Sequence, residues 1–170
     1  MSESGSLDDV TGRVESLPFR DSGLIFETDD FTITTHDDWS NARVAGRDVS
    51  WVLPDEPQQN FADGVLVTVE PMLSSSWDDI HAAVLKGVED ALGLPEVLEQ
   101  VIHSQGSREV GVLVYSVRLA TNKGDVELTF LTVSSLGADS TVLATMGTES
   151  SRFESLRARY EGSLLSIHAS

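Results

Sequence analysis

The order of secondary-structure signals around three tryptophans constrains the fold of this 170-residue chain more than any other feature. A strand-like segment, FTITT, leads to Trp39; a second, VSWVLP, carries Trp51; and Trp77 stands at the start of a helical segment. Strands separated by turns and followed by a helix that needs a surface to cover are typical of an α+β domain. The length suits one domain that buries about two thirds of its unfolded surface.

Two helices are expected. The first begins after Ser76, whose hydroxyl can accept a hydrogen bond from the amide of Asp79. The second follows Ser150 or Ser151, either of which is a good N-cap. Its apolar residues recur at helical spacing and form one stripe, consisting of Phe153, Leu156, Tyr160 and Leu164.

Turn signals divide most of the remaining sequence into strands. Asp29 and Asp30 separate two β-prone runs, and the segments 121–124 and 136–139 separate three longer ones. The fold class predicted is therefore α+β, with an antiparallel-dominated sheet of about six or seven strands packed against two main helices. Residues 1–20 are polar and acidic, so we expect a flexible tail before a single domain that spans residues 21–170.

The charge of the chain excludes several partners. It holds 28 acidic and 11 basic residues, a formal net charge of −17, which repels nucleic acid and anionic membranes. Cysteine is absent, so disulfides and thiolate chemistry are excluded. The N-terminus has no signal-peptide pattern, and no apolar run reaches the roughly 18 residues of a membrane span. We therefore expect a cytoplasmic protein that does not insert into membranes.

Catalytic motifs are not apparent. No GxSxG elbow or glycine-rich phosphate loop occurs in the sequence. His36, Asp37 and Asp38 together offer ligands for a divalent cation, but a solvated acidic loop is the simpler interpretation. Asp78 and His81 are three residues apart on one helix face, yet capping already explains Asp78. We therefore expect no catalytic residue, no bound metal and no cofactor.

Three segments resemble a known family: FTITTHDDW, WVLPDEPQQNF and RFESLRARYEGSLLSIH. They resemble the PsbP-like α/β/α sandwich family, which includes DcrB and LpqN-type proteins, over about residues 24–168. The resemblance implies a terminal helix followed by a short last strand. It also implies a group of mostly non-enzymatic adaptors and chaperones. The lipoprotein cysteine of some members is missing here, as is the proline common before the first tryptophan.

The leading hypothesis is a non-enzymatic, cytoplasmic protein-binding module that acts as an adaptor or chaperone. Its partner would carry a basic or an apolar helical segment, and an uncovered apolar sheet face could receive such a helix. The alternatives are a small-molecule or metal-dependent enzyme, and an acidic surface adapted to high salt. Trp39 and Trp51 are better explained as core residues than as stacking platforms. The candidate partner-binding residues lie along an acidic rim that consists of Asp37, Asp38, Trp39, Trp51, Asp55 and Glu56.

Overall fold

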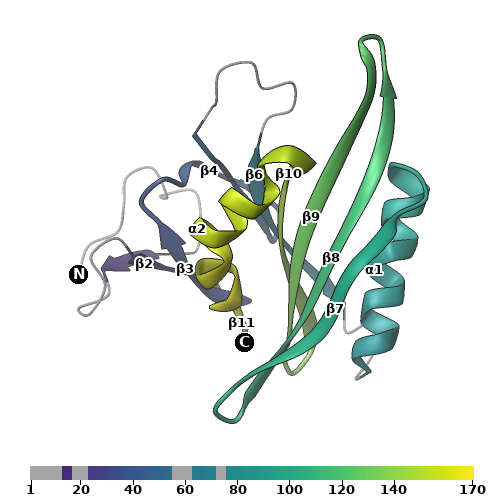
Figure 1. Ribbon diagram of the computed structural model, residues 1–170. Coiled ribbons are helices and arrows are strands. Elements are labelled where there is room, and N and C mark those ends of the chain that lie inside the picture. The colour runs from purple at the N-terminus through teal and green to yellow at the C-terminus, as the bar shows by residue number, and fades with distance from the viewer. Residues whose placement is uncertain (1–12, 17–22, 55–62, 72–75) are drawn as a thin grey trace.

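The computed structural model describes residues 13–16, 23–54, 63–71 and 76–170. Two antiparallel sheets and two helices form most of this part of the chain (Figure 1). Within it, neither helix is long and apolar enough to cross a membrane.

The larger sheet has seven strands, and all neighbouring strands are antiparallel. β6 and β7 are consecutive in sequence, yet β10, β9 and β8 separate them in the sheet. As a result, β4 and β7 form its two edges. The spatial order is β4 (Ser40–Ala45), β5 (Asp48–Val52), β6 (Gly64–Pro71), β10 (Ser140–Glu149), β9 (Gly124–Leu136), β8 (Arg108–Thr121) and β7 (Glu96–Gln105).

The smaller sheet joins the two ends of the described chain. The hydroxyl of Thr28 accepts hydrogen bonds from the amides of Asp30 (3.1 Å) and Phe31 (3.2 Å), which closes the hairpin of β2 and β3. The C-terminal strand pairs with β3, and the amide of Ser170 donates to the carbonyl of Asp30 (2.9 Å). The spatial order is β1 (Arg13–Ser16), β2 (Gly23–Glu27), β3 (Phe31–His36) and β11 (His168–Ala169).

Helix α1 (Trp77–Ala91) begins as its sequence predicts. Ser76 is the N-cap, and its hydroxyl accepts a hydrogen bond from the amide of Asp79 (3.5 Å). Asp78 and Asp79 lie in the first turn, where carboxylates favour the positive end of the helix dipole. Gly93, at a φ of +123°, lets the chain leave the helix and turn into β7.

α1 packs against β8 at a glycine. A Cβ atom on Gly111 would lie 2.6 Å from Cε3 of Trp77 and 2.8 Å from Nε2 of His81. A larger residue would therefore hold the helix away from the sheet. Leu113 and Tyr115 alternate with Gly111 along β8, so they share the face under α1, and both are buried.

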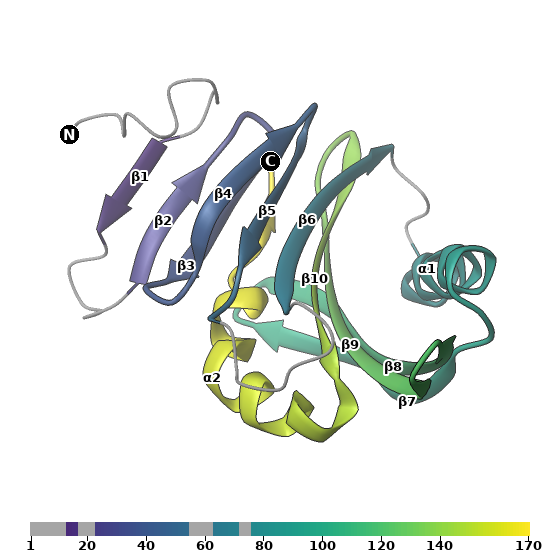
Figure 2. The same cartoon turned by 90° about the horizontal axis from the view of Figure 1, so that it is seen from above.

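Helix α2 (Phe153–Leu165) covers the opposite face of the larger sheet (Figure 2). The apolar stripe predicted for it is confirmed, since Phe153, Leu156, Tyr160 and Leu164 are all buried. The predicted capping serine is wrong. A 3-10 turn, η2 (Ser150–Arg152), comes first, and Arg152 takes the N-cap position without a side-chain hydrogen bond to the helix.

The main core lies between the larger sheet on one side and α2 with the smaller sheet on the other (Figure 2). It contains side chains of β5, β6, β8, β9 and β10, together with residues of β2, β3 and β11. The predicted α+β class, with an antiparallel-dominated sheet of about six or seven strands and two main helices, is confirmed, and the larger sheet has seven strands.

β4 is not anticipated by the sequence, because SNARVA is polar and almost entirely exposed. Arg13–Ser16 of the expected tail forms β1, which pairs with β2. The rest of residues 1–20 lies outside the described part of the chain, so the division at residue 21 stays a prediction.

Candidate functional site

The two tryptophans of the acidic rim are core residues. Trp39 and Trp51 are 7% and 6% exposed, and their ring centroids lie 5.3 Å apart. The ring of Phe26 meets Trp51 edge-on, also at 5.3 Å, so these rings fasten the smaller sheet to the larger one. Neither indole is presented to a partner.

Asp38 ties the turn after β3 to α2. Its carboxylate accepts a hydrogen bond from the hydroxyl of Tyr160 (2.8 Å) and lies 3.6 Å from the guanidinium of Arg159. Burial of the phenol, with this hydrogen bond to Asp38, raises the pKa of Tyr160 to about 12. The backbone amide of Asp38 donates to Nδ1 of His36 (3.0 Å), which requires that nitrogen to be unprotonated. This arrangement is a structural network that fixes the turn.

Asp37 is the exposed member of the predicted rim, whereas Asp55 and Glu56 lie outside the described residues. Partner binding by this rim therefore stays a prediction, and Asp37 is the described residue that can carry it. Among the described residues, no group of three or more His, Asp and Glu side chains is arranged to hold a metal ion.

The face of the larger sheet beside α1 is mixed where no described element covers it, with Leu66 and Val52 as exposed apolar residues among polar ones. Directly paired residues share a face, and one such row runs across the sheet from β9 to β5. It contains Thr132, Thr145, Leu66 and Ser50. The hydroxyls of Thr132 and Thr145 are hydrogen-bonded (2.9 Å), and Leu66 is the exposed apolar residue in the row. This row does not provide the broad apolar face expected to receive a helix.

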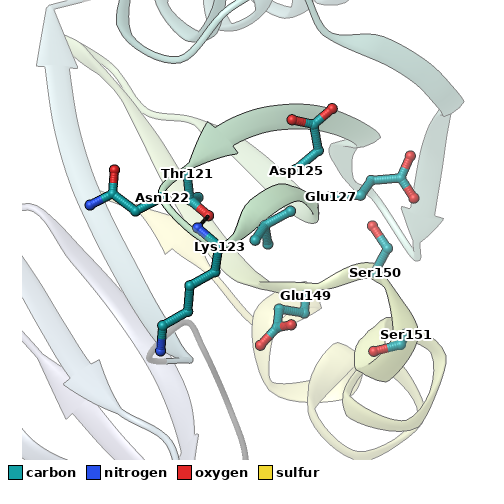
Figure 3. Close-up of a pocket in the computed structure, with 9 residues that line it drawn as sticks. Thr121, Asn122, Lys123, Asp125, Glu127, Glu149, Ser150 and Ser151 are labelled. Atoms are coloured by element: carbon teal, nitrogen blue, oxygen red, sulfur yellow. Dashed lines mark hydrogen bonds between the residues drawn. The ribbon is translucent and has the colours of Figure 1, made fainter.

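A hollow of about 630 Å³ lies beside the turn between β8 and β9. Figure 3 shows that its side chains come from this hairpin, from the end of β10 and from η2. None of its nine lining residues is a histidine, and the hydroxyl of Ser150 is hydrogen-bonded to that of Thr129 (2.6 Å). The hollow is lined mainly by polar and charged side chains, and the hydroxyl of Ser150 is held by Thr129. Its lining residues are Thr121, Asn122, Lys123, Asp125, Val126, Glu127, Glu149, Ser150 and Ser151.

β7, one of the two edge strands of the larger sheet, carries the largest group of exposed apolar side chains among the described residues. We call the exposed residues Val97, Leu98, Val101 and Ile102 the β7 edge; they are 44%, 53%, 47% and 51% exposed. Apolar residues at consecutive positions point to both faces of a strand. β7 pairs with β8 on one side, and no described strand pairs with the other. Another strand could pair along this outer edge.

Natural edge strands are usually protected by lysine, proline, a bulge or inward-pointing charges. β7 has a register shift between Val97 and Glu99, which acts as a bulge near its start. Beyond it, residues 100–105 contain no Asp, Glu, Lys, Arg or Pro. This stretch is an unprotected template for strand pairing.

Carboxylates surround the β7 edge. Asp78 of α1 lies beside it, because its carboxylate is 3.4 Å from the amide nitrogen of Gln100. Glu96 and Glu109 are exposed on β7 and β8. Nearby cations are engaged: Arg157 binds Glu99 through two hydrogen bonds (2.8 and 3.0 Å), which lower the pKa of that carboxyl.

Arg108, at the far end of the same hairpin, is also engaged. Its guanidinium donates to the carbonyls of Leu165 (2.7 Å), the last residue of α2, and Ile167 (2.6 Å) just beyond it. The surroundings of the β7 edge are therefore both apolar and acidic. Sequence reasoning missed this surface. The available signal was an apolar pair, Val101 and Ile102, within a strand that does not alternate.

These elements define an α+β protein with the PsbP-like fold. Three solved structures show the likeness. Cyanobacterial PsbP (CyanoP) from Synechocystis sp. PCC 6803 aligns with a TM-score of 0.59 at 14% identity, over 100% of this chain and 99% of its own. The Ran-binding protein Mog1p of Saccharomyces cerevisiae aligns with a TM-score of 0.55 at 12% identity, over 81% and 89%.

LpqN, a Mycobacterium tuberculosis protein involved in cell envelope biogenesis, aligns with a TM-score of 0.52 at 15% identity, over 96% and 94%. No protein-family model matches the chain, and no curated protein matches it in sequence. The PsbP-like resemblance inferred from the sequence is thus confirmed at the level of the fold.

Proposed function

We propose that this protein is a non-enzymatic binding module for another protein, and that the β7 edge is its main contact. The observation that carries the proposal is the exposure of four apolar side chains along an unpaired strand. Monomeric proteins seldom leave such a strand uncovered, because it invites aggregation. A partner that covers it explains why it is retained.

The likeness in fold to Mog1p, a Ran-binding protein, supports this class of function. The composition of the described sites supports it too. In the hollow beside the β8–β9 turn the hydroxyl of Ser150 is hydrogen-bonded to Thr129, and Asp38 is occupied by structural contacts.

Site-specific photo-crosslinking tests the proposal. A crosslinking amino acid is placed in turn at Ile102 on the β7 edge, at Leu66 on the sheet face beside α1 and at Asp37 on the predicted rim. All three positions are surface-accessible, so each variant can form adducts if a partner lies there. The adducts formed in cells of the source organism are then identified by mass spectrometry.

We expect one specific protein to be captured from Ile102 and not from Leu66. Capture from Asp37 alone would show that the partner contacts the predicted acidic rim and not the β7 edge. The absence of a reproducible adduct from all three positions would contradict the binding proposal itself.

A further inference from the structure

We propose that the β7 edge binds an extended, basic segment of its partner, which adds to the larger sheet as an eighth strand. This inference rests on the proposed function and names the chemistry of the partner. Strand addition uses main-chain hydrogen bonds for affinity and alternate side chains for specificity. Both requirements can be read from the register of β7.

The register assigns the side chains of β7 to the two faces of the sheet. Ile102 lies opposite Gly111, which contacts α1, so Ile102 and its alternates Gln100 and Ser104 are on the α1 face. Val101 lies opposite Val112, a residue of the main core, and is therefore on the α2 face. An added strand must follow the same alternation.

The charges then specify the partner's polar positions. Asp78 contacts Gln100, and Glu109 is paired with Ser104, so a carboxylate lies near each end of the α1 face of the strand. An added residue opposite Ser104 would lie two strand spacings, about 10 Å, from Glu109, a distance that the long side chains of a lysine and a glutamate can bridge over the small Ser104. A partner strand would have cations opposite Gln100 and Ser104 and apolar residues opposite Val101 and Ile102. This gives the core Lys-Val-Ile-Thr-Lys, or its reverse for the opposite strand direction.

A second copy of this chain is a poorer occupant. The chain carries a net charge of −17, so two copies repel each other, and an in-register parallel pairing of two β7 edges would also place Glu96 and Glu99 against their counterparts. Like charges opposed across strands are destabilising. An apolar helix is also disfavoured, because it leaves the outer N–H and C=O groups of β7 without partners. An extended basic segment satisfies the main chain, the apolar residues and the carboxylates together.

Fluorescence anisotropy with synthetic peptides tests the inference on the full chain. The probes are acetylated, dye-labelled peptides containing Lys-Val-Ile-Thr-Lys and its reverse, each with a control in which glutamate replaces lysine. We expect one lysine peptide to bind and neither glutamate peptide to do so. Binding should weaken as ionic strength rises from about 0.01 to about 0.15 M, where the Debye length falls from about 30 to about 8 Å.

Backbone methylation separates strand addition from nonspecific attraction. Two forms of the binding peptide are N-methylated at alternate residues, so one blocks the N–H groups that face β7 and the other blocks those that face solvent. We expect the first to lose binding by about tenfold or more and the second to keep most of it. Equal behaviour of the two forms would overturn strand addition.

Protein variants locate the site. Asp78→Asn should weaken peptide binding by about two- to fivefold, the effect of one exposed ion pair. Asp139→Asn, an exposed acid in the turn between β9 and β10, serves as the matched control and should leave binding unchanged. Equal effects of the two variants would show attraction by net charge alone and would overturn the inference.

Failure of the inference is distinguishable from failure of the proposed function. If no peptide binds while Ile102 still captures a specific protein, the partner's chemistry is wrong and the binding surface stands. Analytical sedimentation of the free protein tests the remaining possibility, that a second copy of the chain occupies the β7 edge. A dimer that Ile102→Lys abolishes would assign the β7 edge to a second copy and overturn the inference.

Discussion

Gly111→Ala should lift α1 from β8 and lower the stability of the protein. The new methyl group would lie 2.6 Å from Cε3 of Trp77 and 2.8 Å from Nε2 of His81, where carbon contacts are normally about 3.5 to 4.0 Å. Both atoms belong to α1, so relief requires the helix or its two side chains to move by about an ångström. Overpacking of this kind costs about 1 to 3 kcal/mol.

Gly87→Ala is the matched control, because it makes the same chemical change within α1 itself. A Cβ at Gly87 would meet no atom within 4 Å. Replacing a glycine in a helix interior by alanine is stabilising by about 0.5 to 1 kcal/mol. The two variants should therefore shift stability in opposite directions.

Urea and thermal unfolding measure both changes. For a domain of this size about 3 °C in Tm accompanies each kcal/mol, so Gly111→Ala should lower Tm by roughly 3 to 9 °C. In a Trp77→Ala background the same substitution should cost much less, because one of its two clashes is gone. A Gly111→Ala protein as stable as the parent would refute the close packing of α1 on β8.

Three further predictions concern other contacts. Burial lowers the pKa of His81, and the nearby charge of Asp78 partly opposes this shift. The contribution of His81 to the free energy of unfolding should therefore be constant above pH 6.5 and should fall as the pH decreases below it. His81→Leu should reduce this dependence on pH in urea titrations. Arg152→Met should lower the free energy of unfolding by about 3 kcal/mol in chemical denaturation, because it leaves the buried carboxylate of Asp63 without its 2.8 Å partner. Arg118→Met, which removes an exposed ion pair with Glu127, is the control and should lower it by less than about 1 kcal/mol. The pKa of Tyr160 is raised, so its stabilising contribution is complete below about pH 10 and is lost as pH rises toward 12. Burial also raises the pKa of Tyr115, so absorbance at 295 nm should show both ionisations delayed, and Tyr160→Phe should remove about half of the delayed amplitude. Ionisation of both tyrosines near pH 10 in the folded protein would contradict their burial.

Local sequence signals predicted the elements that depend on neighbours in the chain. Ser76 caps α1, and the Asp29-Asp30 turn joins β2 to β3, because capping and tight turns are decided within a few residues. The stripe from Phe153 to Leu164 was recognised for the same reason. The N-cap of α2 was missed, since the 3-10 turn before it depends on how β10 enters the helix.

The position of β7 could not be read in this way. Its apolar residues suggest a buried strand, and burial depends on which strands flank it. The crossover from β6 past β10, β9 and β8 places β7 at the edge, and that arrangement is set by pairing between distant segments. For Trp39 and Trp51 the sequence indicated burial but not the residues they pack against. Their core role was anticipated, but their partners Phe26 and Tyr160 come from separate elements.

Amide hydrogen exchange followed by NMR, with and without the lysine peptide, tests the binding role of β7 most directly. Strand addition predicts new protection at every second amide between Glu99 and Ser104, the amides that point away from β8. The amides of β4, at the opposite edge of the same sheet, should be unchanged. Protection confined to β4 or to residues 37–39, or no change along β7, would contradict binding at this edge.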